Sequence, residues 1–219
     1  MKILTTILTH SGTQKRANAC LDTWVKDIQA PHDYFFYGDR AQSQAMHKTW
    51  NCTPDAGEDR GRLPEKTYKM LKMSLDYEWD FLFKCDDDTY VSFNKLVKLL
   101  SKYDFTQDLY IGSQIVTSFP FGQGGAGYIL TRSAVKKCLH SLEPFYQDQS
   151  KNKIAEDYSV GLALRMEGVP LQHTPLLGTP DPNTAKQNQS VCVDAIIKNN
   201  KITTHYVNPD TMKKIYSES

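Results

Sequence analysis

One stretch decides the fold: Asp80-Phe81-Leu82-Phe83-Lys84-Cys85-Asp86-Asp87-Asp88-Thr89-Tyr90-Val91. The apolar run from Trp79 to Cys85 predicts a buried strand, and three carboxylates follow directly at its carboxyl end. Like charges this close raise one another's pKa or recruit a cation. In open α/β sheets, ligands bind beyond the carboxyl ends of the strands. The stretch therefore predicts an α/β sheet with a charged ligand site at one edge.

Hard divalent cations such as Mn²⁺ and Mg²⁺ bind carboxylate oxygens and share their remaining positions with substrate phosphates. We therefore interpret Asp86, Asp87 and Asp88 as a metal site. The alternative is an acidic turn that caps the next helix, although a cap needs only one Asp.

The segments on either side of this stretch have the pattern of an α/β fold. A strand is expected at 3–9, a helix at 15–26 and a second strand at 32–38, an order typical of a parallel sheet. The remaining expected elements are helices from residue 64 and at 93–100, 133–142 and 154–167, strands at 109–112, 128–130, 170–174 and 202–207, and a long loop at 175–190.

Composition is that of one globular domain over residues 1–219. The chain is 40% hydrophobic and 23% charged, with a net charge of +1, so neither nucleic acid nor an anionic membrane is an expected partner. The sequence has neither a signal peptide nor an apolar run of about 18 residues. We expect a cytoplasmic protein as written, or a Golgi-lumenal one if the chain was cut from a longer anchored protein.

The five cysteines are scattered and form no CxxC pair. This argues against a zinc site and against a disulfide scaffold. Cys20 and Cys85 lie in apolar patterns and are expected to be reduced core residues.

A glycine-rich segment, Gly122-Gln123-Gly124-Gly125-Ala126-Gly127, precedes the strand expected at 128–130. Glycine permits positive φ and close approach of the backbone to a ligand. The segment neither follows the first strand nor opens a helix, which excludes a dinucleotide-binding fingerprint. It is either a ligand-facing loop or a mobile surface loop.

A carboxylate pair, Glu156-Asp157, opens an otherwise apolar helix. The helix dipole favours negative charge at this end, which is a structural explanation. The functional explanation is a general base that deprotonates an acceptor hydroxyl.

His205 lies in the strand expected at 202–207, where it would share a face with Thr203 and Val207. A neutral imidazole suits Mn²⁺ as a partner to one Asp. The alternative is a histidine that packs at a surface edge.

These features, in this order, resemble glycosyltransferase family 31, which includes the fringe N-acetylglucosaminyltransferases and the core 1 β1,3-galactosyltransferases. The resemblance covers most of the chain. The matching segments are Lys15-Arg16-Ala17 with Asp22-Thr23-Trp24, Phe83 to Val91, Gly124-Gly125-Ala126-Gly127-Tyr128, and Glu156-Asp157 with Val160-Gly161.

The resemblance implies a GT-A fold: a Rossmann-like, mixed, mostly parallel sheet flanked by helices. Residues 1–115 would form the donor-nucleotide and metal half, and 116–219 the acceptor and catalytic-base half. A UDP-sugar donor, Mn²⁺ or Mg²⁺, a glycan or glycoprotein acceptor, and inversion at the anomeric carbon are also implied.

The resemblance also implies roles for individual residues. The metal would be bound directly by Asp88 and His205, while Asp86 and Asp87 would contact the nucleotide or brace the metal site. The base would be Asp157, with Glu156 as second candidate. The uridine and diphosphate pocket would be lined by Thr9, Arg16, Asp39 and Lys72, and the acceptor-side loop would include Gly124, Gly125 and Tyr128.

Two other functions fit parts of this pattern. One is a catalytically inactive, carbohydrate-binding domain with the same fold. The other is a metal-dependent phosphoryl or nucleotidyl transferase, which ranks lower because two-metal chemistry usually needs ligands from several strands and only one acidic cluster follows a strand here.

Overall fold

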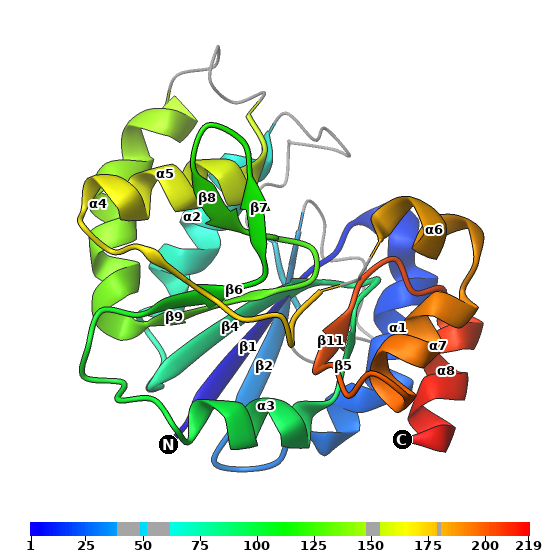
Figure 1. Ribbon diagram of the computed structural model, residues 1–219. Coiled ribbons are helices and arrows are strands. Elements are labelled where there is room, and N and C mark those ends of the chain that lie inside the picture. The colour runs from blue at the N-terminus through cyan, green and yellow to red at the C-terminus, as the bar shows by residue number, and fades with distance from the viewer. Residues whose placement is uncertain (39–48, 52–61, 148–153, 179–180) are drawn as a thin grey trace.

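A seven-stranded mixed sheet forms the centre of the computed structural model (Figure 1), which describes residues 1–38, 49–51, 62–147, 154–178 and 181–219. The strand order is β10-β6-β9-β4-β1-β2-β3. The strands are β1 (Ile3–Leu8), β2 (Asp33–Gly38), β3 (Thr49–Asn51), β4 (Phe81–Asp86), β6 (Tyr110–Gly112), β9 (Tyr128–Thr131) and β10 (Leu171–His173).

All neighbouring strands of this sheet are parallel except β9, which is antiparallel to both β4 and β6. The register of β1 and β4 pairs Leu8 with Asp86. The carboxyl ends of the two central strands therefore meet at one edge of the sheet, and the acidic triplet begins there.

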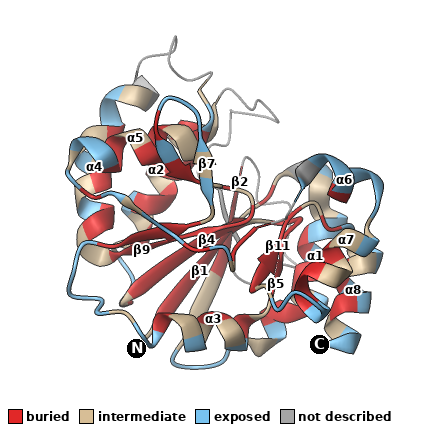
Figure 2. Ribbon diagram, viewed as in Figure 1, coloured by how far each residue is buried: buried red, intermediate tan, exposed pale blue. Residues whose placement is uncertain are grey.

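Helices cover both faces of the sheet (Figure 1). One face carries α2 (Leu63–Ser74), α4 (Arg132–Gln147) and α5 (Glu156–Met166). The other carries α1 (Gln14–Asp22), α3 (Phe93–Leu100), α7 (Ser190–Ile197) and α8 (Pro209–Glu218). Figure 2 shows the central strands β1, β4 and β9 buried between these layers. Side chains alternate between two cores, so that Phe81 and Phe83 pack on one face and Leu82 on the other.

Two small sheets complete the arrangement. One pairs β5 (Tyr90–Val91) with β11 (Thr203–Thr204), and the other is a hairpin of β7 (Gln114–Val116) and β8 (Pro120–Gly122). The first sheet brings the C-terminal part of the chain to the segment that follows the acidic triplet.

Most expected elements are confirmed within a few residues, but three expectations are wrong. The expected loop at 175–190 contains α6 (Pro182–Gln187), which begins with Pro182 after the capping residue Asp181. The strand expected at 202–207 ends at Thr204, because Tyr206 has a φ of +66° that a strand does not allow. The helix expected at 15–26 ends at Asp22, and a 3₁₀ turn follows at Trp24–Asp27.

Four cysteines fall within the described residues, namely Cys20, Cys85, Cys138 and Cys192, and all four are buried and free. The expectation of reduced core residues at Cys20 and Cys85 is confirmed. None of the described helices combines the length and the apolar character needed to cross a membrane.

Candidate active site

A cleft of about 970 Å³ opens beyond the carboxyl ends of β1 and β4. Its lining comes from β4 and the acidic triplet, the segment after β1, helices α1, α2 and α5, and the glycine-rich segment 122–127. The C-terminal part of the chain adds Lys186, Gln187, Gln189 and residues 205–208. Segments far apart in the sequence therefore meet in one cavity, whose size suits a ligand of several hundred daltons.

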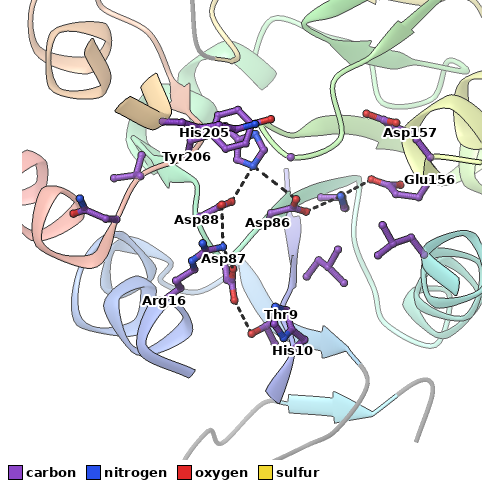
Figure 3. A pocket seen from close by; sticks show the side chains of 18 of the residues that line it. Thr9, His10, Arg16, Asp86, Asp87, Asp88, Glu156, Asp157, His205 and Tyr206 are labelled. Atoms are coloured by element: carbon purple, nitrogen blue, oxygen red, sulfur yellow. Dashed lines mark hydrogen bonds and ion pairs between the residues drawn. The ribbon is translucent and has the colours of Figure 1, made fainter. Parts of the chain in front are cut away.

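Asp86, Asp88 and His205 converge on one side of this cleft (Figure 3). His205 Nε2 lies 2.9 Å from Asp88 Oδ1 and 3.8 Å from Asp86 Oδ2. Burial alone would raise the pKa of Asp88, but the hydrogen bond and charge of His205, together with Arg16, hold that pKa below its usual value.

The three side chains fit a hard divalent cation. Their ligand atoms all lie within 4.8 Å of one another, and adjacent ligands of an octahedral Mg²⁺ or Mn²⁺ lie about 3 Å apart. Two carboxylate oxygens and one imidazole nitrogen also form a donor set that suits Mn²⁺. Among the residues that the structure describes, this is the one cluster of three or more such ligands.

Backbone contacts on either side of His205 place its side chain at the cluster. Thr204 pairs with Tyr90 in the β5–β11 sheet, and the Val207 amide donates to the Asp88 carbonyl at 2.8 Å. The left-handed backbone at Tyr206 turns the chain between these two contacts, and the Tyr206 ring stacks on His205 with centroids 3.8 Å apart. The histidine is thus held by a turn and not by the strand face that the sequence pattern predicts.

Gly125 packs directly against His205. A Cβ atom added at this glycine would lie 2.0 Å from His205 Cε1. The Gly125 carbonyl also accepts hydrogen bonds from the Asp86 amide at 3.2 Å and from Thr89 Oγ1 at 2.7 Å. Glycine is therefore required here because the backbone and the imidazole ring approach so closely.

Asp87 points away from the other two carboxylates, toward Thr9 (Figure 3). Its Oδ2 accepts hydrogen bonds from Thr9 Oγ1 at 2.8 Å and Thr13 Oγ1 at 2.5 Å. Burial raises the pKa of Asp87 to about 7, against these two hydrogen bonds. Arg16 bridges the carboxylates, with Nη1 3.1 Å from Asp88 Oδ2 and 3.9 Å from Asp87 Oδ1.

The two carboxylates at the start of α5 have different surroundings. Glu156 is buried, and its Oε1 accepts a hydrogen bond from Lys84 Nζ at 2.5 Å. Burial raises the pKa of Glu156, and the ion pair with Lys84 opposes that shift. Asp157 is half-buried and borders the cleft, and its Oδ2 accepts from the Gly124 amide at 3.0 Å.

The structure does not bring every residue of the expected site together. Lys72 is exposed near the end of α2 and is not among the residues that line the cleft. Tyr128 is fully buried, with its hydroxyl 3.3 Å from Glu156 Oε2, so it lies beneath α5 and not at the surface of the cavity. Asp39 lies outside the described residues.

Two buried lysines of the cleft were missed by the sequence pattern. Lys66 of α2 and Lys84 of β4 are both buried and line the cavity. For Lys84 a signal existed, because a lysine inside an otherwise apolar strand needs a buried acceptor. For Lys66 the helical pattern gave no such signal.

Solved glycosyltransferases share this fold. The galactosyltransferase LgtC, solved with donor and acceptor sugar analogues, matches with a TM-score of 0.56 over 99% of this chain and 95% of that chain, at 11% identity. A glycosyltransferase involved in glycosylation of the major capsid of PBCV-1 matches with a TM-score of 0.55 over 98% of this chain and 97% of that chain, at 12% identity. The fold is therefore that of the GT-A glycosyltransferases.

The chain belongs to the Fringe-like family, whose model matches residues 3–204. A glycoprotein-N-acetylgalactosamine 3-beta-galactosyltransferase 1 of Xenopus laevis is 34% identical over 119 residues, or 52% of this chain and 32% of the relative. The radical fringe beta-1,3-N-acetylglucosaminyltransferase of Notophthalmus viridescens is 24% identical over an alignment that covers 95% of this chain and 57% of the relative. The chain thus spans less than two thirds of the length of either relative.

Proposed function

We propose that the chain is a metal-dependent, inverting glycosyltransferase that moves a sugar from a UDP-sugar to a hydroxyl of a glycan or glycoprotein acceptor. The observation that carries the proposal is the convergence of Asp86, Asp88 and His205 in a cleft that Asp157 also borders. Membership of the Fringe-like family, whose named relatives are β1,3-glycosyltransferases, supports the same conclusion.

The donor would lie with its diphosphate toward the Asp86–Asp88–His205 cluster. Mn²⁺ or Mg²⁺, when bound there, would neutralise charge on the diphosphate and on the departing UDP. Arg16 has a side chain that is 44% exposed, so it can turn from Asp88 toward a phosphate oxygen. Lys66 and Lys186 also line the cleft and add positive charge. Thr9 borders the same cavity beside Asp87.

Asp157 is the better candidate for the general base. A base must reach the acceptor hydroxyl and must have a lone pair for its proton. Glu156 is buried, and one of its oxygens is bound to Lys84 at 2.5 Å. Its carboxylate is therefore already paired with an ammonium group. Asp157 is half-buried at the cleft, and each of its oxygens accepts one amide hydrogen bond and keeps a second lone pair.

In the proposed step, the Asp157 carboxylate takes the proton of the acceptor hydroxyl. The acceptor oxygen forms its bond to the anomeric carbon on the face opposite UDP, while the bond between that carbon and the UDP oxygen breaks. One displacement inverts the anomeric configuration. Residues 1–115 would supply most of the donor and metal contacts and 116–219 the base, with His205 crossing from the second half to the first.

The test is release of UDP from a panel of UDP-sugars, with and without Mn²⁺, and with GDP-sugars as the specificity control. A transferase of this kind hydrolyses its donor slowly without acceptor, so Mn²⁺-dependent UDP release from at least one UDP-sugar is expected. A thermal-shift measurement on the same panel gives an independent readout, because a ligand that binds only the folded state raises the melting temperature.

Two variants make the test specific. Asp88→Asn keeps the shape of the side chain but weakens its binding to the metal, so this variant should lose the Mn²⁺-dependent increase in melting temperature. Asp194→Asn, which alters an exposed ion pair with Lys198 on α7, should behave as wild type. Mn²⁺-dependent binding of UDP without any release from UDP-sugars would instead indicate an inactive, carbohydrate-binding domain.

A further inference from the structure

Lys84 is buried inside the central sheet, and the proposed reaction gives it no direct role. It lies on β4 two residues before Asp86, so the two side chains share a face of the strand. The Lys84 side chain is only 1% exposed. A buried ammonium is unfavourable unless acceptors and opposite charge surround it.

Lys84 Nζ donates to three acceptors, and each acceptor belongs to a different segment. They are Asp86 Oδ1 on β4 at 2.9 Å, Glu156 Oε1 on α5 at 2.5 Å and the Gly124 carbonyl of the glycine-rich segment at 3.2 Å. An ammonium group has three N–H donors, so these acceptors use all of them. Lys84 therefore has no donor left for a substrate, although it borders the cleft.

Gly124 connects this lysine to the proposed base. Its carbonyl accepts from Lys84, while its amide donates to Asp157 Oδ2 at 3.0 Å. A Cβ atom at Gly124 would lie 2.3 Å from Glu156 Oε1 and 2.9 Å from Asp157 Cβ. The absence of a side chain thus lets the loop lie directly against the first turn of α5.

From these contacts we propose that Lys84 is a positioning residue, which fixes the Asp157 carboxylate, through Gly124, relative to the metal-side carboxylate Asp86. The inference rests on the proposed function, because it requires Asp157 to be the base. A misplacement of about 1 Å in a reacting group can lower the rate roughly 100-fold. Losing Lys84 should therefore slow the chemical step while leaving the donor site in place.

The central experiment uses Lys84→Met, which keeps much of the length of the side chain and removes its charge. The kcat of Mn²⁺-dependent UDP release, with the UDP-sugar that wild type hydrolyses fastest, should fall roughly 10- to 100-fold. The KM for that UDP-sugar should stay within about threefold. Hydrogen exchange of the Gly124 amide, measured on a peptide covering 121–130 in metal-free protein, should become faster.

Two further variants separate positioning from folding. Lys84→Met/Glu156→Gln removes both charges of the buried ion pair, a change that is often neutral or stabilising, and it should lose kcat like the single variant. Leu142→Ala, at a fully buried position of α4, should lower the melting temperature without changing kcat. In an Asp157→Asn background, Lys84→Met should cause no additional loss, because the two residues act through one carboxylate.

The outcomes are distinct. An active wild type whose Lys84→Met and double variants keep kcat within about threefold overturns the inference alone, and so does a full additional loss of kcat in the Asp157→Asn background. A wild type that releases UDP from none of the UDP-sugars overturns the proposed function and the inference with it.

Discussion

Replacement of Gly125 by alanine is expected to disrupt the metal site without changing any ligand. A Cβ atom at this position would lie 2.0 Å from His205 Cε1 and 2.5 Å from both ring nitrogens. Ordinary contact begins at 3.4 Å, so the ring would have to withdraw by about 1.4 Å, the difference between 3.4 Å and 2.0 Å. The loop cannot easily move in its place, because the Gly125 carbonyl accepts hydrogen bonds from Asp86 and Thr89.

A shift of that size is large for a metal ligand. His205 Nε2 lies 2.9 Å from Asp88 Oδ1, and the metal–ligand distances of Mg²⁺-like ions are about 2.0–2.1 Å. Changes that displace a ligand without removing it typically lower metal affinity roughly 10- to 100-fold. For Gly125→Ala this corresponds to about 1.4–2.7 kcal/mol of binding free energy.

The assay is isothermal titration of Mn²⁺ in the presence of saturating UDP. Gly125→Ala and His205→Ala should both bind Mn²⁺ more weakly than wild type. Gly168→Ala is the matched control, because Gly168 has a φ of +72° but nothing within 4 Å of an added Cβ. It should lose about 1 kcal/mol of stability from backbone strain and keep its Mn²⁺ affinity. If Gly125→Ala binds as wild type while His205→Ala does not, the argument from close approach is wrong; if both bind as wild type, His205 is not a ligand.

Three other predictions concern the carboxylates. Asp157→Asn should lower the rate of UDP release roughly 10²- to 10⁴-fold with unchanged UDP binding; near-normal turnover would move the role to Glu156 or away from α5. Asp88→Ala should abolish Mn²⁺-dependent UDP binding while circular dichroism shows an intact fold; normal turnover by the folded fraction of an unstable variant would make the triplet structural. Because burial raises the folded-state pKa of Asp87 from 3.8 to about 7, this group should lower wild-type stability as pH rises between these values. Melting curves in EDTA should therefore show Asp87→Asn gaining stability relative to wild type from pH 5 to about 8. A difference in melting temperature that stays constant over this pH range would refute the predicted direction of the effect.

The sequence by itself determined much of the sheet and the location of the acidic site. The apolar strand that runs into Asp86-Asp87-Asp88 specified both, because burial requires the strand and three adjacent charges require a site at its end. The glycine-rich segment and the Glu156-Asp157 pair also fall beside this site. Local patterns were sufficient here because each feature lies within a few consecutive residues.

Patterns failed where a residue's environment depends on distant segments. The expected loop at 175–190 contains α6, and the strand expected at 202–207 stops at Thr204. Both errors lie in the C-terminal part of the chain, where α6 packs against α7 and β11 pairs with β5, so these short elements depend on their neighbours more than on their own periodicity. Lys72 was expected in the donor pocket, but helix geometry leaves it exposed near the end of α2.

Only the tertiary structure decided how the three aspartates differ. Asp86 and Asp88 face His205, which is more than a hundred residues away in the sequence, while Asp87 turns to Thr9 and Thr13. The same is true of Glu156 and Asp157, which are adjacent in sequence but differ because Lys84 reaches only the first. Sequence specifies which charges are present, but their protonation, pairing and access to a ligand depend on the side chains that the fold places around them.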